Sequence, residues 1–340
     1  MKERQIFCEY QPYMFYSPVR NNRALYQKAA SNDATTIDAF GKTWVDQAKA
    51  NKKKFGSFGN KGVGQLFGKY LHRPVICAGS GPSLKYNADE LKNRGAIPLV
   101  SCLHNFQYFM DKGISVDYWV TLDAGLITVE EISEGGQHPP EHYWEKTRDQ
   151  VLLAYIGTHP ELLERWQGPV YFYNSPIPDQ KVRDELAEVE VFNNWVSSGG
   201  NVLGAAVYIA KGYFGCGATI FVGADFSFGY DRKFHSWDSK YDSKMGTTIQ
   251  AVDIFGHKVS TWPSYNNFKS FFDYVALEVP GIYINCTEGG TLGSYPDGNI
   301  HTIKQMDLKD CLKMYNMSDL IKDAALDPKI EGEHGRRILY

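Results

Sequence analysis

The chain has 340 residues, of which 43% are hydrophobic, enough to bury the core of one large α/β domain. No apolar run has the length that crosses a bilayer, and residues 1–10 are too charged for a signal peptide, so we expect a cytoplasmic protein without a membrane span. The six cysteines are scattered and include no C-x-x-C pair. This spacing argues against a disulfide framework or a structural zinc site and fits a reducing compartment.

The net charge of −3 is distributed unevenly along the chain. Residues 1–72 contain twelve Lys or Arg and five Asp or Glu, a balance of +7, so the remaining residues sum to −10. We predict that residues 1–72 form a basic helical N-terminal extension, in which helices at 22–30 and 35–50 precede an irregular, glycine-rich neck at 55–64. Such a segment on an acidic body favours contact with an anionic partner, nucleic acid included. A solvated helical arm that packs on the body explains the charge equally well.

After residue 73, short apolar runs alternate with segments of helical pattern. The runs are residues 74–78, 97–102, 116–122, 151–156, 170–173, 218–222 and 282–285, and the helical segments are 84–94, 106–112, 160–166, 179–188 and 202–213. This order predicts an α/β fold with a Rossmann-like, mostly parallel sheet and helices on both faces. We assign that domain to residues 73–316 and a C-terminal tail to 317–340. Two long irregular stretches, 228–263 and 287–302, are predicted to be lids or disordered.

A glycine-rich loop with the sequence AGSGPSL ends the first predicted strand. Gly79 and Gly81 permit a tight turn, and Pro82 suits the first position of the next helix, whose N–H groups form an anion site. Ser80 or Ser83 adds a hydroxyl contact. The loop has no Walker Gly-Lys-Ser/Thr and is not a full G-x-G-x-x-G. We interpret it as a phosphate-binding loop, with a plain strand-to-helix turn capped by Ser83 as the alternative.

A second loop, SSGGNV, opens a helix of small residues. Close packing against the sheet explains the small residues that follow but not the loop itself, so we interpret the loop as ligand-facing. Its candidate residues are Ser197, Ser198, Gly199, Gly200 and Asn201. Because both loops need close approach of the backbone to the ligand, Gly81→Val or Gly200→Val is expected to abolish nucleotide binding and leave the fold largely intact.

Two acidic residues, Asp123 and Asp225, follow predicted strands at their carboxyl ends. Acids in this position hold Mg²⁺, bind ribose hydroxyls or act as a base, and Asp is also a common turn former and helix cap. We expect these ends to share one edge of the sheet, where ligands of parallel α/β folds collect.

The stretch after Asp225 is rich in aromatic residues and contains two histidines, His235 and His257. We single out His235 and Asp225 as the catalytic candidates, with His235 as a general base or phosphate partner and Asp225 organising the lid. We place His257 in a hairpin turn. Tyr230 and Trp237 are the candidate lid contacts.

The motif INCTEGG follows the last predicted strand. It predicts a turn that closes the site, with Asn285 and Glu288 as polar contacts, or a turn that merely ends an edge strand.

Taken in order, AGSGPSL, the THP of residues 158–160, SSGGNV, VGADFSF with a His about ten residues on, and INCTEGG resemble one family over residues 73–315. This is the motility accessory factor and 6-hydroxymethylpterin diphosphokinase (MptE-like) family. The resemblance implies a Rossmann-like fold. It also implies one of two activities: archaeal pterin members transfer diphosphate from ATP with Mg²⁺, and flagellar members are linked to transfer of nonulosonic acids onto flagellin.

The same loops are similar to those of bacterial sialyltransferases that use CMP-sugars. That similarity implies that residues 79–83 and Asn105 hold the nucleotide, that the Ser-Gly loop contacts the donor phosphate or sugar, and that a His serves as base or phosphate partner. With two candidate histidines, the assignment to His235 rests on its place after Asp225.

The leading hypothesis is therefore a transferase, specifically a glycosyltransferase that uses a nucleotide-sugar donor and a glycan, protein or small alcohol as acceptor. The first alternative is a diphosphokinase that acts on a pterin-like alcohol, with Mg²⁺ held by Asp123 and Asp225. The second is a non-catalytic nucleotide-binding module whose basic N-terminus docks on a partner.

Overall fold

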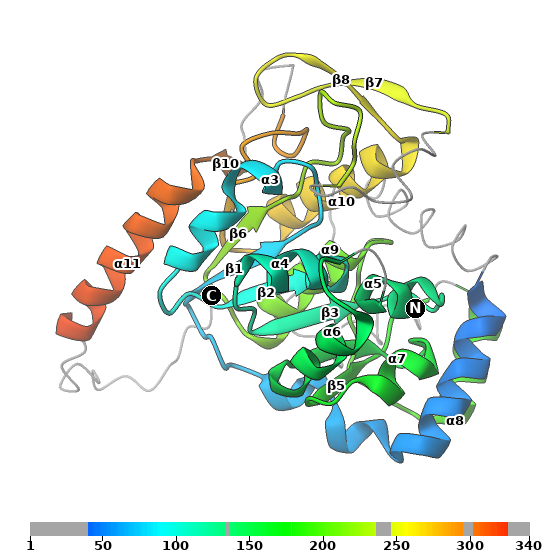
Figure 1. Cartoon of the computed structure of the whole chain (residues 1–340). Coiled ribbons are helices and arrows are strands. Elements are labelled where there is room, and N and C mark those ends of the chain that lie inside the picture. The colour runs from blue at the N-terminus through cyan, green and yellow to red at the C-terminus, as the bar shows by residue number, and fades with distance from the viewer. Residues whose placement is uncertain (1–39, 134–135, 178, 236–245, 295–301, 326–340) are drawn as a thin grey trace.

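The computed structural model describes residues 40–133, 136–177, 179–235, 246–294 and 302–325 (Figure 1). An eight-stranded sheet lies at its centre, in the order β10-β9-β6-β1-β2-β3-β4-β5, and each pair of neighbours is parallel. The strands are β1 Pro74–Ala78, β2 Leu99–Cys102, β3 Tyr118–Thr121, β4 Leu152–Tyr155, β5 Val170–Tyr173, β6 Ala218–Val222, β9 Ile282–Asn285 and β10 Ile303–Gln305. The predicted α/β fold with a mostly parallel sheet is confirmed.

The central strands β1 and β6 are buried at every position, as their unbroken apolar runs indicate. From β1 the chain proceeds through β2, β3, β4 and β5 in one direction and then returns to β6 on the other side of β1. The strand order therefore reverses between β1 and β6, where ligands bind in open α/β sheets. Backbone bonds join the two following loops directly, from Gly79 N to Val222 O at 2.9 Å and from Gly81 N to Gly223 O at 2.9 Å.

Helices, most of them short, lie between the strands, and a long one follows the last strand. They are α3 Leu84–Asn87, α4 Phe106–Lys112, α5 Ile127–Ser133, α6 Pro140–Lys146, α7 Pro160–Arg165, α8 Gln180–Val189, α9 Val202–Tyr208, α10 Pro263–Glu278 and α11 Leu308–Ala325. Helix α9 packs on β1, β2 and β3, because Gly204, Ala205 and Ala206 bring its backbone close to the sheet. Helix α11 extends beyond residue 316, so the predicted tail begins inside a helix. Among the described residues, no helix is both long and apolar enough to cross a membrane.

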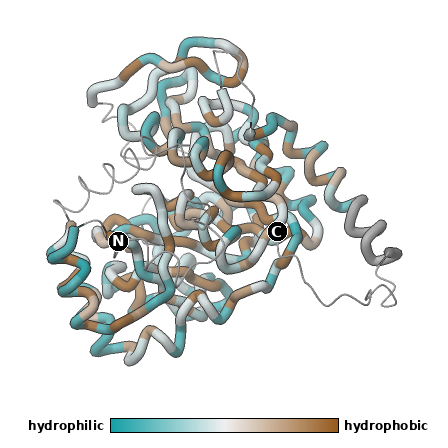
Figure 2. Tube along the Cα trace, turned by 180° about the vertical axis from the view of Figure 1, so that it is seen from behind, coloured by the Kyte–Doolittle hydropathy of each residue, from teal (hydrophilic) through white to brown (hydrophobic). Residues whose placement is uncertain are grey.

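Residues 40–72 pack against the body of the protein. Residues 40–55 form a helix that is mostly hydrophilic, with hydrophobic residues at spaced positions (Figure 2). This helix buries Trp44, Val45 and Ala48. The glycine-rich stretch that follows forms two 3-10 helices, η1 Phe58–Lys61 and η2 Val63–Leu66. The prediction of an irregular neck is wrong here because Phe58 and Val63 are buried, and Phe58 packs on Phe172 of β5 at 4.9 Å between ring centroids. The predicted helix at 22–30 lies outside the described residues, and the domain boundaries stay predictions.

The stretch at 228–263 is more regular than predicted. It contains an antiparallel hairpin of β7 Ile249–Val252 and β8 Lys258–Thr261. Residues 236–245, including Trp237, lie outside the described residues. Strand β9 is not an edge strand, since β10 pairs with it on its outer side.

Candidate active site

A cleft of about 240 Å³ lies at the carboxyl ends of β1, β2, β3 and β6. Seven of the predicted site residues line it, namely Gly79, Ser80, Gly81, Asp123, Asn201, Asp225 and His235. The cleft is also lined by residues that the sequence analysis did not single out, among them Cys102, His104, Glu131, Phe226, Phe234, Tyr265 and Phe268. The loops at the reversal of strand order thus line one cleft, at the edge where the parallel sheet predicts a site.

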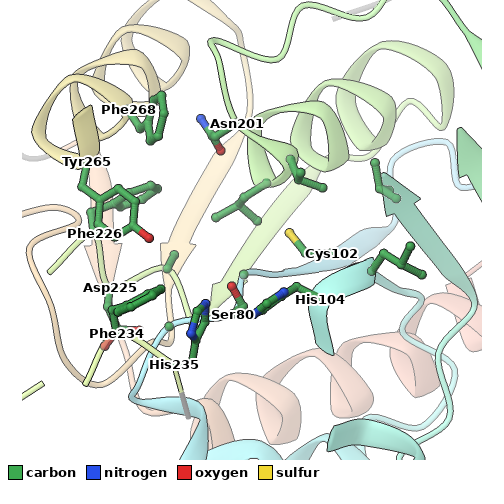
Figure 3. A pocket seen from close by; sticks show the side chains of 18 of the residues that line it. Ser80, Cys102, His104, Asn201, Asp225, Phe226, Phe234, His235, Tyr265 and Phe268 are labelled. Carbon is green, nitrogen blue, oxygen red and sulfur yellow. The ribbon is translucent and has the colours of Figure 1, made fainter. Parts of the chain in front are cut away.

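The glycines after β1 allow close contact with the loop after β6. A Cβ atom at Gly79 would overlap the carbonyl oxygen of Gly223, and one at Gly81 would overlap the carboxylate of Asp225. The expectation that Gly81→Val leaves the fold largely intact is therefore wrong, because the added side chain collides with protein atoms. Ser80 lies between these glycines and faces the cleft (Figure 3).

Asp225 connects the two loops. Its Oδ1 accepts a hydrogen bond from the Ser83 N–H at 3.2 Å, and its Oδ2 accepts one from the Ser83 hydroxyl at 2.7 Å. Burial raises the pKa of the Asp225 carboxyl to about 7, although both bonds from Ser83 favour the carboxylate. The two residues stabilise the shape of the loops, and Ser83 does not line the cleft.

Asn105 and most of the Ser-Gly loop also lie behind the cleft. Asn105 is fully buried and donates from Nδ2 to Gly79 O at 2.7 Å and to Ser101 Oγ at 3.0 Å. It therefore supports the loop after β1 from below. Asn201 caps α9 by accepting from Gly204 N at 2.8 Å, and a Cβ at Gly199 would overlap the ring of Phe271 in α10.

The wall formed by β2, β3 and α5 contains a histidine and two carboxylic acids. His104 follows β2, and its Nδ1 lies 2.6 Å from Oε1 of Glu131 in α5. Asp123 follows β3. Its side chain is exposed to the cleft, but the surrounding protein partly desolvates the carboxyl. This desolvation, reinforced by Glu131, raises the pKa of Asp123 to about 6. His104 was not singled out from the sequence, although its place directly after a strand was the available signal.

Aromatic side chains form the facing wall. Phe226 and Phe234 come from the loop after β6, and Tyr265 and Phe268 come from the first turns of α10. In Figure 3 these rings lie on one side of the cleft, and Cys102 and His104 lie on the other. Phe226 has a positive φ of 49°, a conformation that is unusual for an aromatic residue. For Tyr265 and Phe268, the available signal in the sequence was the spacing of the aromatic residues in α10.

The two candidate histidines differ in location. His235 is 7% exposed, lines the cleft and stacks beside His104 with 4.3 Å between ring centroids. Burial, and then His104, lower the pKa of His235 to about 2, so the ring is neutral at physiological pH. His257 lies in the β7–β8 turn, as predicted, with its Nδ1 3.0 Å from the Tyr230 hydroxyl. Tyr230 also donates to Asp253 and does not line the cleft.

The INCTEGG turn stabilises the edge of the sheet. Asn285 is buried and donates from Nδ2 to Leu292 O and Gln305 Oε1, each at 3.0 Å. Glu288 accepts from Leu308 N at 2.9 Å at the start of α11. Neither side chain lines the cleft, so their predicted role as ligand contacts stays a prediction.

The described residues do not group into a cluster of three or more His, Cys, Asp or Glu side chains that could hold a metal ion. Asp123 and Asp225 both line the cleft, but both oxygens of Asp225 already accept hydrogen bonds from Ser83. The magnesium site stays a prediction.

A family model for 6-hydroxymethylpterin diphosphokinase MptE-like proteins matches residues 47–231, more than half of the chain. The chain belongs to the MptE-like family. The match begins in the helix of residues 40–55, inside the segment that the sequence analysis set apart as an extension. No curated protein matches the chain.

Among solved structures, the fold resembles that of the MAf glycosyltransferase from Magnetospirillum magneticum AMB-1. The two chains are 16% identical with a TM-score of 0.53, and the match covers 75% of this chain and 37% of that one. This MptE-like chain therefore spans little more than a third of that protein, and the likeness concerns the fold.

Proposed function

We propose that the cleft binds a nucleotide-activated donor and that the protein is a transferase, specifically a glycosyltransferase that uses a nucleotide-sugar. The MptE-like family implies a nucleotide substrate and a transferase activity. The observation that favours a nucleotide-sugar over a triphosphate is the charge of the cleft: none of the described residues that line it is Lys or Arg. Transfer from a triphosphate relies on cations that neutralise the phosphates, whereas a nucleotide-sugar carries less charge and a large polar sugar.

The arrangement of the cleft suggests where each part of the donor binds. The donor phosphate lies beside Ser80 and Asn201, with the ring of His235, which is neutral before the donor binds, as its hydrogen-bond partner. The aromatic wall, which includes Tyr265 and Phe268, stacks on the nucleobase. Asp225 organises the loops through Ser83 and does not take part in the chemistry.

A diphosphokinase remains the second candidate, and the Asp123 carboxylate in the cleft is the observation that favours it. There Asp123 would hold Mg²⁺ on the phosphates of ATP, which supplies the missing positive charge.

Calorimetry with CMP, UDP, GDP and ATP, each with and without Mg²⁺, tests the proposal. Tight binding of CMP or UDP without Mg²⁺, followed by nucleotide release from CMP-sialic acid or UDP-N-acetylglucosamine, supports the glycosyltransferase. A strict requirement for Mg²⁺ together with ATP contradicts it in favour of the diphosphokinase. Binding without release of any nucleotide indicates a non-catalytic module.

A further inference from the structure

His104 and Glu131 form an imidazole–carboxylate contact in the cleft to which the proposed function assigns no role. The two residues are 27 positions apart, yet His104 Nδ1 and Glu131 Oε1 are 2.6 Å apart. Their side chains are 19% and 12% exposed, so water competes little for this contact. Both line the cleft.

The contact determines the orientation of the His104 ring. A carboxylate at Nδ1 holds the hydrogen on that nitrogen and selects the neutral form in which Nε2 has the lone pair. With Nδ1 engaged by Glu131, any proton transfer by this ring goes through Nε2. A carboxylate that orients an imidazole toward a substrate hydroxyl is the recurring arrangement of general-base catalysis.

His235 occupies a different position relative to the same space. Its ring is more deeply buried and lies tilted beside the His104 ring, with 4.3 Å between the ring centroids. Solvent therefore stabilises its cation poorly, and it suits a hydrogen bond to a phosphate oxygen better than the removal of a proton. The other ionisable groups around the pair are Asp123 after β3 and the Cys102 thiol at the end of β2.

We propose that His104, oriented by Glu131, is the base that removes the hydroxyl proton of the acceptor, and that Glu131 is its positioning residue. This rests on the proposed transferase function. In the step, the acceptor oxygen bonds to the anomeric carbon of the donor sugar. The bond from that carbon to the donor phosphate breaks, its electron pair leaves on the phosphate oxygen, and the hydroxyl proton moves to Nε2 of His104.

The first test is spectroscopic and needs no substrate. The protein is labelled with ¹⁵N-histidine, and the His104 signals are assigned by their loss in His104→Gln. We expect the hydrogen on Nδ1 in the wild type, and a mixture of both neutral forms in Glu131→Ala. A wild-type ring with its hydrogen on Nε2 overturns the proposal, because Nε2 then has no lone pair to accept a proton.

The second test measures the release of CMP from CMP-sialic acid with lactose as the hydroxyl acceptor, and of AMP from ATP with 6-hydroxymethylpterin. His104→Ala is expected to lower kcat by about 10²–10⁴-fold, with the dissociation constant for the nucleotide unchanged and partial rescue by added imidazole. Glu131→Gln is expected to lower kcat less, without a change in KM. Glu130→Gln, the neighbour on the same helix, is the matched control and should behave as the wild type.

The outcomes separate the two proposals. Equal release by the wild type and His104→Ala overturns the role of His104 and leaves the transferase function intact. Absence of release from either donor by the wild type contradicts the proposed function itself, and the role of His104 with it.

Discussion

Asp225 accepts hydrogen bonds from both the backbone N–H and the hydroxyl of Ser83, a residue 142 positions earlier in the chain. This pair fixes the loop after β6 to the loop after β1, at the point where the strand order reverses. The carboxyl is buried, and its pKa is raised to about 7 from an ordinary value of 3.8. The shape of the cleft and the pH dependence of stability are therefore linked through one side chain.

We first predict that Asp225 makes the protein less stable as pH rises from about 4 to 7. In that window the folded protein binds the Asp225 proton more tightly than the unfolded chain does, so the free energy of unfolding falls with pH by at most about 1.4 kcal/mol per unit. Asp225→Asn should remove this slope. Urea denaturation at pH 4, 5.5 and 7 measures it, and identical slopes in both proteins would contradict the prediction.

The second prediction concerns Gly81, whose added Cβ would overlap the Asp225 carboxylate. Gly81→Ala should lower the free energy of unfolding, and part of this loss should disappear in the Asp225→Ala background. The remainder reflects the carbonyl oxygen of Gly223, which is also 2.7 Å from the added atom. A double-mutant cycle in urea should give a coupling of about 0.5–3 kcal/mol. Additive losses would show that the two residues do not contact each other.

Third, we expect the aromatic wall to contribute to nucleotide affinity through stacking. Tyr265→Ala or Phe268→Ala should weaken binding of CMP, UDP or ATP by about 5- to 150-fold, equivalent to about 1–3 kcal/mol per stacked base. Calorimetry measures this with ribose 5-phosphate as a ligand that lacks the base. Phe255, which is 60% exposed and does not line the cleft, provides the control variant Phe255→Ala. An equal loss for ribose 5-phosphate would argue against stacking.

The fourth prediction follows from the neutral state of His235. Its pKa is lowered to about 2 by burial, so the unfolded chain binds this proton more tightly and stability is lost as pH falls below about 6.5. A donor phosphate beside the ring favours the cation and reverses part of this shift. We therefore expect nucleotide binding at pH 6 to take up protons from the buffer.

Calorimetry of CMP binding in two buffers of different ionisation enthalpy measures this uptake. His235→Gln should abolish the proton uptake. His257→Gln, a change in the β7–β8 turn, should leave the uptake as it is in the wild type. Proton uptake that persists in His235→Gln would assign the effect to another group.

Fifth, the helix of residues 40–55 should be required for a stable fold. Asn51 is 1% exposed and donates from Nδ2 to Ile156 O and Thr158 O, both at 2.9 Å. Asn51→Ala leaves these buried carbonyls with one donor fewer and should cost about 1–3 kcal/mol in the free energy of unfolding. Lys49→Ala, an exposed change on the same helix, is the control. Equal stability of all three proteins would show that the helix contributes little.

The sequence by itself determined the class of fold and the place of the site. The unbroken apolar runs of β1 and β6 mark buried parallel strands, and the loops that follow them contain the residue types that line the cleft. Parallel strands bring their carboxyl ends to one edge, so Ser80, Asp123 and Asp225 could be placed together from local pattern alone.

Only the tertiary structure decided which of those residues face the cleft and which support it. His104 and Glu131 meet because α5 packs beside the end of β2, and no local pattern encodes a contact across 27 residues. Gly81 is a glycine because Asp225 lies against it, and not only because a ligand approaches. The protonation states of Asp225 and His235 depend on burial, which is a property of the packed molecule. Local periodicity encodes the strands, but the contacts between strand ends depend on strand order and side-chain packing, which form only when the sheet assembles.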